Sequence, residues 1–175
     1  MNHSIILHLA IFRINIGRHK NFTSLSNMPK RIIGSKMENN TEYVWDVYQP
    51  TPMMSTYTIG MAVLNDHVVV QKQLGTRNIS TYAPAVANST TERGQNEYNL
   101  NHTLLLLSIY EEYFNATDEL PKIDSLSVLG HQYAAMENWG LIVYKMGYHA
   151  SLDMIGHELA HFWFGNLVTC KNWNE

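Results

Sequence analysis

The chain has 175 residues, enough for one ordinary domain or for parts of two. Hydrophobic residues make up 45% and aromatic residues 11% of it, so it can bury a core and is not a disordered chain. With a formal net charge of −3 and only 15% charged residues, it offers no basic stripe for phosphate backbones, which argues against a nucleic-acid partner.

The sequence carries signs of the secretory route but no visible membrane anchor. Asn-x-Ser/Thr triplets are more frequent than the roughly two that chance predicts; they start at Asn2, Asn21, Asn39, Asn78, Asn88, Asn101 and Asn115. Glycosylation there would place the protein in the extracellular space or on the outer face of the plasma membrane, unless an Asn-rich sequence collected them by accident. No apolar run reaches the ~20 residues that span a bilayer. The single cysteine, Cys170, forms no internal disulfide.

The first part of the chain has the alternating pattern of β-strands. We expect strands within 9–16 and 22–30, a solvated loop over 33–41, and a strand with Tyr43, Trp45 and Val47 on one face. A further strand is predicted over 57–63, followed by a turn into Val68–Val70.

The second part changes to helical periodicity. A helix is indicated by the stripe Leu100, Leu104, Leu107 and Phe114, after a polar stretch over 87–96 that we expect to separate it from the strands. Short strands are expected around residues 126–128 and 141–144, before a final helix. The change of period favours two partial domains, 1–72 and 73–175, in an α+β fold.

The final helix carries the pattern His157-Glu158-x-x-His161. Its histidines are one turn apart, so both imidazoles can converge on one ion, and zinc is the natural occupant. Glu158 can reach a metal-bound water without becoming a ligand, as the general base of a zinc hydrolase does. The alternative to a metal site is that the two residues are ordinary core or surface histidines. We expect an apolar face to anchor this helix, made of Ile155, Leu159, Phe162 and Trp163. We interpret the remaining patternless histidines as surface or loop residues: His67, His102, His131 and His149.

A second motif, Ala134-Ala135-Met136-Glu137-Asn138-Trp139-Gly140, lies upstream of the first, and Phe162-Trp163-Phe164-Gly165-Asn166-Leu167-Val168-Thr169 flanks it. Together they resemble the gluzincin zinc metalloaminopeptidases related to aminopeptidase N. The resemblance extends with varying strength from about Phe12 to Glu175. It implies the last strands of a β-sheet domain, followed by the front of a thermolysin-like zincin catalytic domain.

The resemblance also implies roles for individual residues. His157 and His161 would bind Zn²⁺, and Glu158 would take a proton from the attacking water. Glu137 would bind the free α-amine of a peptide substrate, while the backbone of Ala135, Met136 and Asn138 would pair with the extended peptide. An ordinary exposed carboxylate remains the alternative for Glu137.

Four departures from the family pattern stand out. The family's third zinc ligand, a glutamate, would fall just past Glu175, and Glu175 itself occupies the place of another acidic residue. The family's transition-state-stabilising tyrosine would lie further on. The connection from Tyr144 to His157 is shorter than in the family, so the motif helix is expected to begin late. The first glycine of the substrate loop is Ala134, which is tolerable where φ is not positive.

These features predict a zinc aminopeptidase that releases N-terminal residues from peptides, in a fragment expected to be inactive by itself. The full-length form is expected to be membrane-anchored or secreted. One alternative is a non-catalytic, truncated paralogue that acts as an extracellular binding protein. Another is a zinc endopeptidase, which would leave Glu137 and its loop unexplained.

Overall fold

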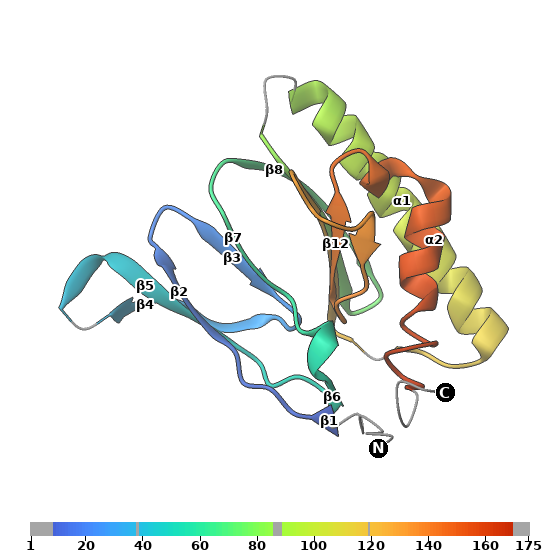
Figure 1. Cartoon of the computed structure of the whole chain (residues 1–175), viewed down its shortest axis with the longest axis horizontal. Coiled ribbons are helices and arrows are strands. Elements are labelled where there is room, and N and C mark those ends of the chain that lie inside the picture. The colour runs from blue at the N-terminus through green and yellow to red at the C-terminus, as the bar shows by residue number, and fades with distance from the viewer. Residues whose placement is uncertain (1–8, 38, 86–88, 119, 170–175) are drawn as a thin grey trace, which may run out of the picture.

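A five-stranded mixed sheet divides the molecule, with two helices on one side and three small antiparallel sheets on the other (Figure 1). The structure is a computed structural model that describes residues 9–37, 39–85, 89–118 and 120–169. The strands are β1 (Leu9–Ala10), β2 (Asn15–His19), β3 (Thr23–Ser26), β4 (Lys30–Met37), β5 (Asn40–Tyr48), β6 (Met54–Ser55), β7 (Met61–Leu64), β8 (His67–Leu74), β9 (Arg77–Pro84), β10 (Lys122–Val128), β11 (Ala135–Met136) and β12 (Leu141–Lys145). The helices are α1 (Ser89–Phe114) and α2 (Leu152–Ala160), with short 3-10 helices η1 (Thr56–Thr58) and η2 (Tyr148–Ala150).

The five-stranded sheet has the order β11-β12-β10-β9-β8. β10 pairs in parallel with both β9 and β12, so the chain crosses over through α1 to pass from β9 to β10. β8 pairs antiparallel with β9, and β11 pairs antiparallel with β12. The short β11 therefore forms one edge of the sheet, and the predicted substrate loop consists of β11 and the residues that follow it.

The first part of the chain is β-rich, as predicted, with sheets β2-β5-β4, β3-β7 and β1-β6. The loop predicted over 33–41 is wrong, because most of it belongs to a β4–β5 hairpin. Irregular pairing in that hairpin, with register shifts along β4, blurs the alternation that would reveal a strand. The strand predicted over 57–63 is also shorter than expected, because Thr56–Thr58 forms η1 and pairing starts at Met61.

Helix α1 begins well before its apolar stripe, at Ser89. The polar stretch over 87–96, expected to separate it from the strands, is helical from Ser89 onward, and Asn96 of this stretch is buried against the sheet. The side-chain amide of Asn96 donates to the carbonyl oxygens of Val68 and Thr81, and that of Asn99 donates to the carbonyl of His149. Hydrogen bonds thus attach the first half of α1 to the rest of the fold, as apolar packing does further along the helix.

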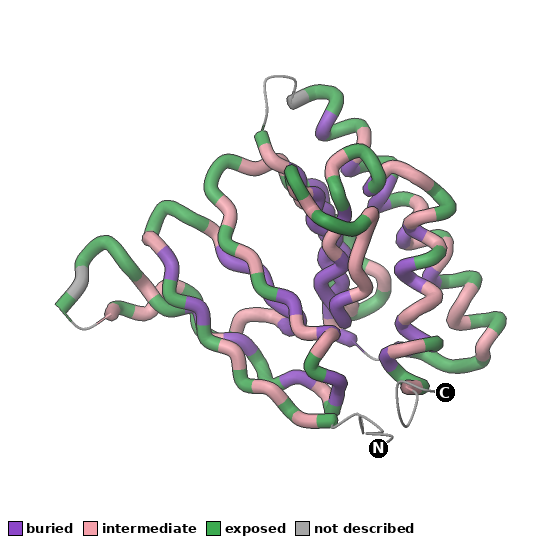
Figure 2. The backbone as a smooth tube through the Cα atoms, in the orientation of Figure 1, coloured by how far each residue is buried: buried purple, intermediate pink, exposed green. Residues whose placement is uncertain are grey.

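The main core lies between the sheet and the two helices, where Figure 2 shows the buried segments gathered. Its fully buried members include Ile79, Leu107, Ile123, Ile142, Ile155, Leu159 and Phe162. A smaller cluster of Leu25, Leu126 and Leu141 lies on the other face of the sheet, against the small sheets. This arrangement confirms the predicted α+β class. The predicted boundary between residues 72 and 73 falls within β8 and stays a prediction. Among the described residues, no helix has the length and apolar character needed to cross a membrane.

Candidate metal and substrate site

The two motif histidines converge as the sequence predicts. His157 lies in the last turn of α2 and His161 caps its C-terminus, with His161 still in helical geometry. Their Nε2 atoms are 3.2 Å apart, and the ring planes meet at 88°. Two nitrogen ligands of a tetrahedral zinc ion, each at about 2.05 Å, would be separated by about 3.3 Å. The pair therefore has the spacing that a shared metal ion requires.

A backbone carbonyl orients the second imidazole. The Nδ1 atom of His161 lies 3.1 Å from the carbonyl oxygen of Phe164, which can only accept, so the ring proton resides on Nδ1. The Nε2 lone pair is left to face His157, which is the tautomer that a metal ligand needs. Gly165, with φ of 133°, lets the chain turn back so that this carbonyl reaches the ring.

Glu158 is the buried acid of the site. Only 4% of its surface is exposed, and its Oε2 atom has no hydrogen-bond partner among the described residues. Burial first and the negative charge of Glu137 second raise the pKa of its carboxyl, His161 partly offsets both, and the net pKa is about 7. A carboxyl group that titrates near neutral pH is suited to accept and release a proton.

The opposite face of α2 is anchored in the core, as predicted. Ile155, Leu159 and Phe162 are fully buried, and Trp163 is 5% exposed. The indole N–H of Trp163 donates to the carbonyl of Ala116 at 3.0 Å, and its ring packs on aromatic side chains of α1. This packing fixes the position of both histidines relative to the sheet.

The predicted substrate loop lies beside the motif helix. Ala135 and Met136 pair with Tyr144 and Val143 of β12 through one edge of β11. Glu137 follows directly, half-buried, and its charge is close enough to raise the pKa of Glu158. The side-chain amide of Asn166 donates to the carbonyl of Glu137 at 3.2 Å, so the turn after the motif helix holds the loop.

The first part of the chain contacts the residues around the site, which sequence reasoning missed. Tyr57 donates from its hydroxyl to the carbonyl of Gly165 at 3.3 Å. The side-chain amide of Asn138 donates to the carbonyls of Tyr57 and Ile59. This side chain therefore binds the η1 segment, and only the backbone of Asn138 is predicted to contact substrate. Asn166 was visible as part of the motif flank, but no local pattern singles out Tyr57.

Two expectations about the departures can be compared with the structure. Ala134 is not among the residues with positive φ, so its replacement of the first glycine is tolerated, as predicted. The short connection after β12 closes through η2, and α2 begins only at Leu152. His149 of η2 is fully buried, so its interpretation as a surface residue was wrong. Burial lowers the pKa of this imidazole, opposed by the charge of Glu92.

Within the described part of the chain, no third histidine, cysteine, aspartate or glutamate joins the two histidines in a metal-binding group. The position expected for the third ligand falls past residue 175. Of the residues singled out from the sequence, Asn2, Asn88, Cys170 and Glu175 lie outside the described residues.

Comparison with known proteins identifies the relatives of the chain. Residues 98–175 match the peptidase family M1 domain. The chain is 33% identical over 182 residues to the thyrotropin-releasing hormone-degrading ectoenzyme of Rattus norvegicus, an alignment that covers 97% of the chain and 16% of that protein. It is 35% identical to endoplasmic reticulum aminopeptidase 2 of Homo sapiens and 32% identical to aminopeptidase Ey of Gallus gallus, each over 95% of the chain and 18% of the relative.

The chain thus spans less than a fifth of the length of these relatives, two of which are named aminopeptidases. The similarity nonetheless extends over nearly all of the chain, from the small sheets to the motif helix. The chain therefore belongs to the M1 family of peptidases, of which it represents one part.

Proposed function

We propose that this chain provides the motif helix and the amine-binding loop of a zinc-dependent aminopeptidase, which releases N-terminal residues from peptides. The observation that carries the proposal is the pair of Nε2 atoms 3.2 Å apart beside a buried, unpartnered Glu158. The tether between Asn166 and Glu137 supports it, because it joins the amine-binding loop to the turn after the motif helix.

The residues present fit a zinc ion. His157 and His161 offer two converging imidazoles, and the Nδ1 hydrogen bond of His161 leaves its Nε2 free to bind. A bound zinc ion would supply Lewis-acid chemistry, by lowering the pKa of a water and polarising the substrate carbonyl. Glu158 stands next to His157 on the helix without being needed as a ligand.

The roles of the protein groups follow from their chemistry. Glu158 would accept the proton of the attacking water and pass it to the leaving amine, which a carboxyl with a pKa near 7 does in both directions. Glu137 would pair with the ammonium group of the substrate, which limits cleavage to the first residue. The backbone of Ala135, Met136 and Asn138 would pair with the extended peptide along the edge of the sheet.

We expect residues 1–175 by themselves to bind zinc weakly and to turn over little substrate. Two imidazoles are one protein ligand short of a catalytic zinc site, and a missing oxyanion donor costs about 3 kcal/mol of transition-state stabilisation. A non-catalytic role, as an extracellular protein that binds peptide amino ends, is therefore the second candidate.

We further propose that the chain follows the secretory route as a glycoprotein and that its longer form is secreted or membrane-anchored. The described sequon asparagines are exposed: Asn21, Asn39, Asn78, Asn101 and Asn115. Two relatives support the route by name, one as an ectoenzyme and one as a protein of the endoplasmic reticulum.

The decisive experiment places this chain in a longer relative. The corresponding part of human endoplasmic reticulum aminopeptidase 2 is replaced by residues 9–175, and release of the first residue from a short peptide is measured. We expect release from the free peptide but not from its N-acetylated form, and a loss of at least about 100-fold in Glu158→Gln. Unchanged release in Glu158→Gln would remove the mechanism, and cleavage of the acetylated peptide would favour an endopeptidase.

The non-catalytic candidate predicts a different result. The chimera would then bind a free peptide, measured by fluorescence anisotropy, with no release at any zinc concentration. Binding that persists in Glu137→Gln would remove the role of Glu137 in both candidates.

A further inference from the structure

A polar hollow of about 380 Å³ lies on the opposite face of the sheet from the motif helix. Its walls come from β3 and β4 on one side and from β8, β9 and β10 on the other. Thr81 of β9 bonds to Asn99 of α1, so its neighbours Ser80 and Tyr82 point to the other face, into the hollow. The hollow is therefore separate from the proposed peptidase site. Clefts between packed units are common places for small ligands.

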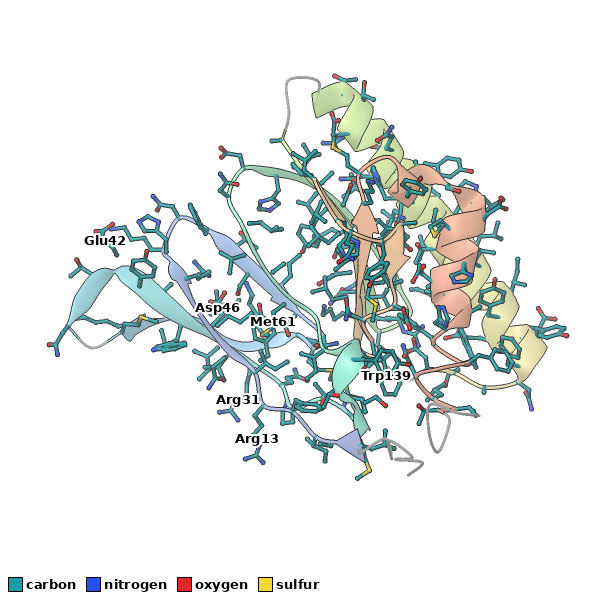
Figure 3. All side chains as sticks on the ribbon, viewed as in Figure 1. Arg13, Arg31, Glu42, Asp46, Met61 and Trp139 are labelled. Atoms are coloured by element: carbon teal, nitrogen blue, oxygen red, sulfur yellow. The ribbon has the colours of Figure 1, made fainter. Side chains whose placement is uncertain are left out.

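Two residues that line the hollow, Ser24 and Lys30, contact a carboxylate that does not itself line it and that is surrounded by hydrogen-bond donors. Asp46, labelled in Figure 3, is fully buried. It accepts from Arg18 Nε at 2.6 Å and from Lys30 Nζ at 2.9 Å. It also accepts from the Ser24 hydroxyl at 2.6 Å and from the Gly34 amide at 2.8 Å. Burial by itself would raise the pKa of Asp46, but these hydrogen bonds outweigh it and hold the pKa well below its usual value. Arg18 and Lys30 thus share a single negative charge.

The second charged pair in the hollow balances itself. Lys122 donates to Asp124 at 2.7 Å, to the Gly140 carbonyl at 2.8 Å and to the Ser26 carbonyl. Three acceptors require three hydrogens, so Lys122 is an ammonium group, although burial lowers its pKa. Its charge and that of Asp124 cancel. The cations around the hollow therefore exceed the carboxylates by one.

The excess charge is located at Lys30. Arg18 holds Asp46 in a two-pronged contact, through Nε and through Nη2 at 3.0 Å, whereas Lys30 reaches the same carboxylate with one hydrogen bond. Lys30 is 18% exposed and lines the hollow, so its remaining hydrogens are available there. A largely buried cation without its own counter-charge is costly, and an anion beside it removes that cost.

We propose that this hollow binds a small monovalent anion, either a halide or a small carboxylate, beside the ammonium group of Lys30. Hydroxyl and amide groups on the wall suit such a ligand, since Ser80, Tyr82 and Gln71 line the hollow. The anion would stabilise the contact between the small sheets and the five-stranded sheet, because the hollow lies between them.

The test measures thermal unfolding of the 175-residue chain during titration with sodium bromide, sodium formate or sodium acetate. We expect a saturable rise in melting temperature of about 3–5 °C at a tenfold excess over the dissociation constant. Lys30→Met should lose this response and melt at or above the wild-type temperature without added anion, since its unbalanced charge is gone. The matched control is Lys36→Met, an exposed lysine of the same strand, which should respond like wild type.

The anion series and a second variant complete the test. A response to bromide alone identifies a halide, and a response to formate or acetate alone identifies a carboxylate; either result supports the site. If Lys30→Met does not fold, Lys30→Gln replaces it, because glutamine keeps a hydrogen bond to Asp46 and removes the charge. The Lys30→Gln variant must also lose the response to the anion. An unsaturating rise that is equal in wild type and both Lys30 variants would overturn the proposal. So would an anomalous bromide map of a soaked crystal without a peak at Lys30 Nζ.

Discussion

Replacing Glu158 with glutamine is expected to make the metal-free chain more stable at pH 8. The carboxyl of Glu158 has its pKa raised from 4.5 to about 7 in the folded chain, by burial first and by Glu137 second. A raised carboxyl pKa means that the folded state holds its proton while the unfolded state has released it. Folding stability therefore falls as the pH rises from about 4.5 to about 7 and is level above that window.

The size of the effect follows from the same shift. Each pKa unit corresponds to about 1.4 kcal/mol, so the full shift amounts to roughly 3 kcal/mol. Because His157 beside it is exposed and admits water to the rim of the site, we reduce this to about 2 kcal/mol. Glutamine carries no charge at any pH, so Glu158→Gln should exceed wild type by that amount at pH 8 and equal it near pH 4.

The assay is urea unfolding at pH 4 and pH 8 in a metal chelator with dilute protein. Histidine titrations occur in both proteins and cancel in the comparison. Glu97→Gln, at an exposed position of α1, is the control and should show no such pH dependence. Glu137→Gln should recover part of the gain, because it removes the neighbouring charge. A Glu158→Gln variant that is no more stable than wild type at pH 8 would refute the inference that a buried, uncompensated carboxylate lies at the site.

Three further predictions concern the metal, the loop and its tether. Zinc should raise the melting temperature of wild type at pH 7.5 but not that of His161→Ala, because the variant has lost one of the two converging imidazoles. Equal stabilisation of the variant would place the metal elsewhere. Gly140→Ala should lower the free energy of unfolding by about 3 kcal/mol or more, measured by urea unfolding. Gly140 has φ of 90°, and an added Cβ would collide with the Asn27 carbonyl oxygen. In the chimera, Asn166→Ala should raise KM for a free peptide about tenfold through loss of its bond to Glu137, with zinc content unchanged; loss of zinc as well would show a merely structural role.

The site was predictable where a short motif contains its own geometry. The spacing of His157 and His161 fixes their convergence, because residues four apart share a helix face. The apolar positions of the same helix, such as Ile155 and Leu159, likewise follow from period alone and are fully buried. The roles of these residues in binding zinc and substrate stay predictions.

The rest depended on contacts between segments distant in sequence. Tyr57 reaches Gly165, and Asn96 reaches Val68, through hydrogen bonds that no local period reveals. His149 was misjudged for the same reason, since its burial arises from the packing of η2 under α1 rather than from its apolar neighbours. The β4–β5 hairpin was not predicted, because its irregular pairing obscures the alternation of buried and exposed residues that marks a strand. Tertiary contacts override local pattern at each of these positions.

The side-chain amide of the residue just after β3 connects that strand to the predicted substrate loop. The side chain of Asn27 donates to the carbonyls of Thr58 and Trp139 and accepts from the amide of Gly60, so one buried group joins three separate segments. Trp139 follows Glu137 by two residues and lies beside η1 (Figure 3). Any local opening of β3 would release this joint and loosen the loop in the same event. Amide hydrogen exchange at Gly60 and Trp139 should therefore proceed with a common opening free energy, so that a change in the small sheets would also alter the loop that we propose to bind substrate.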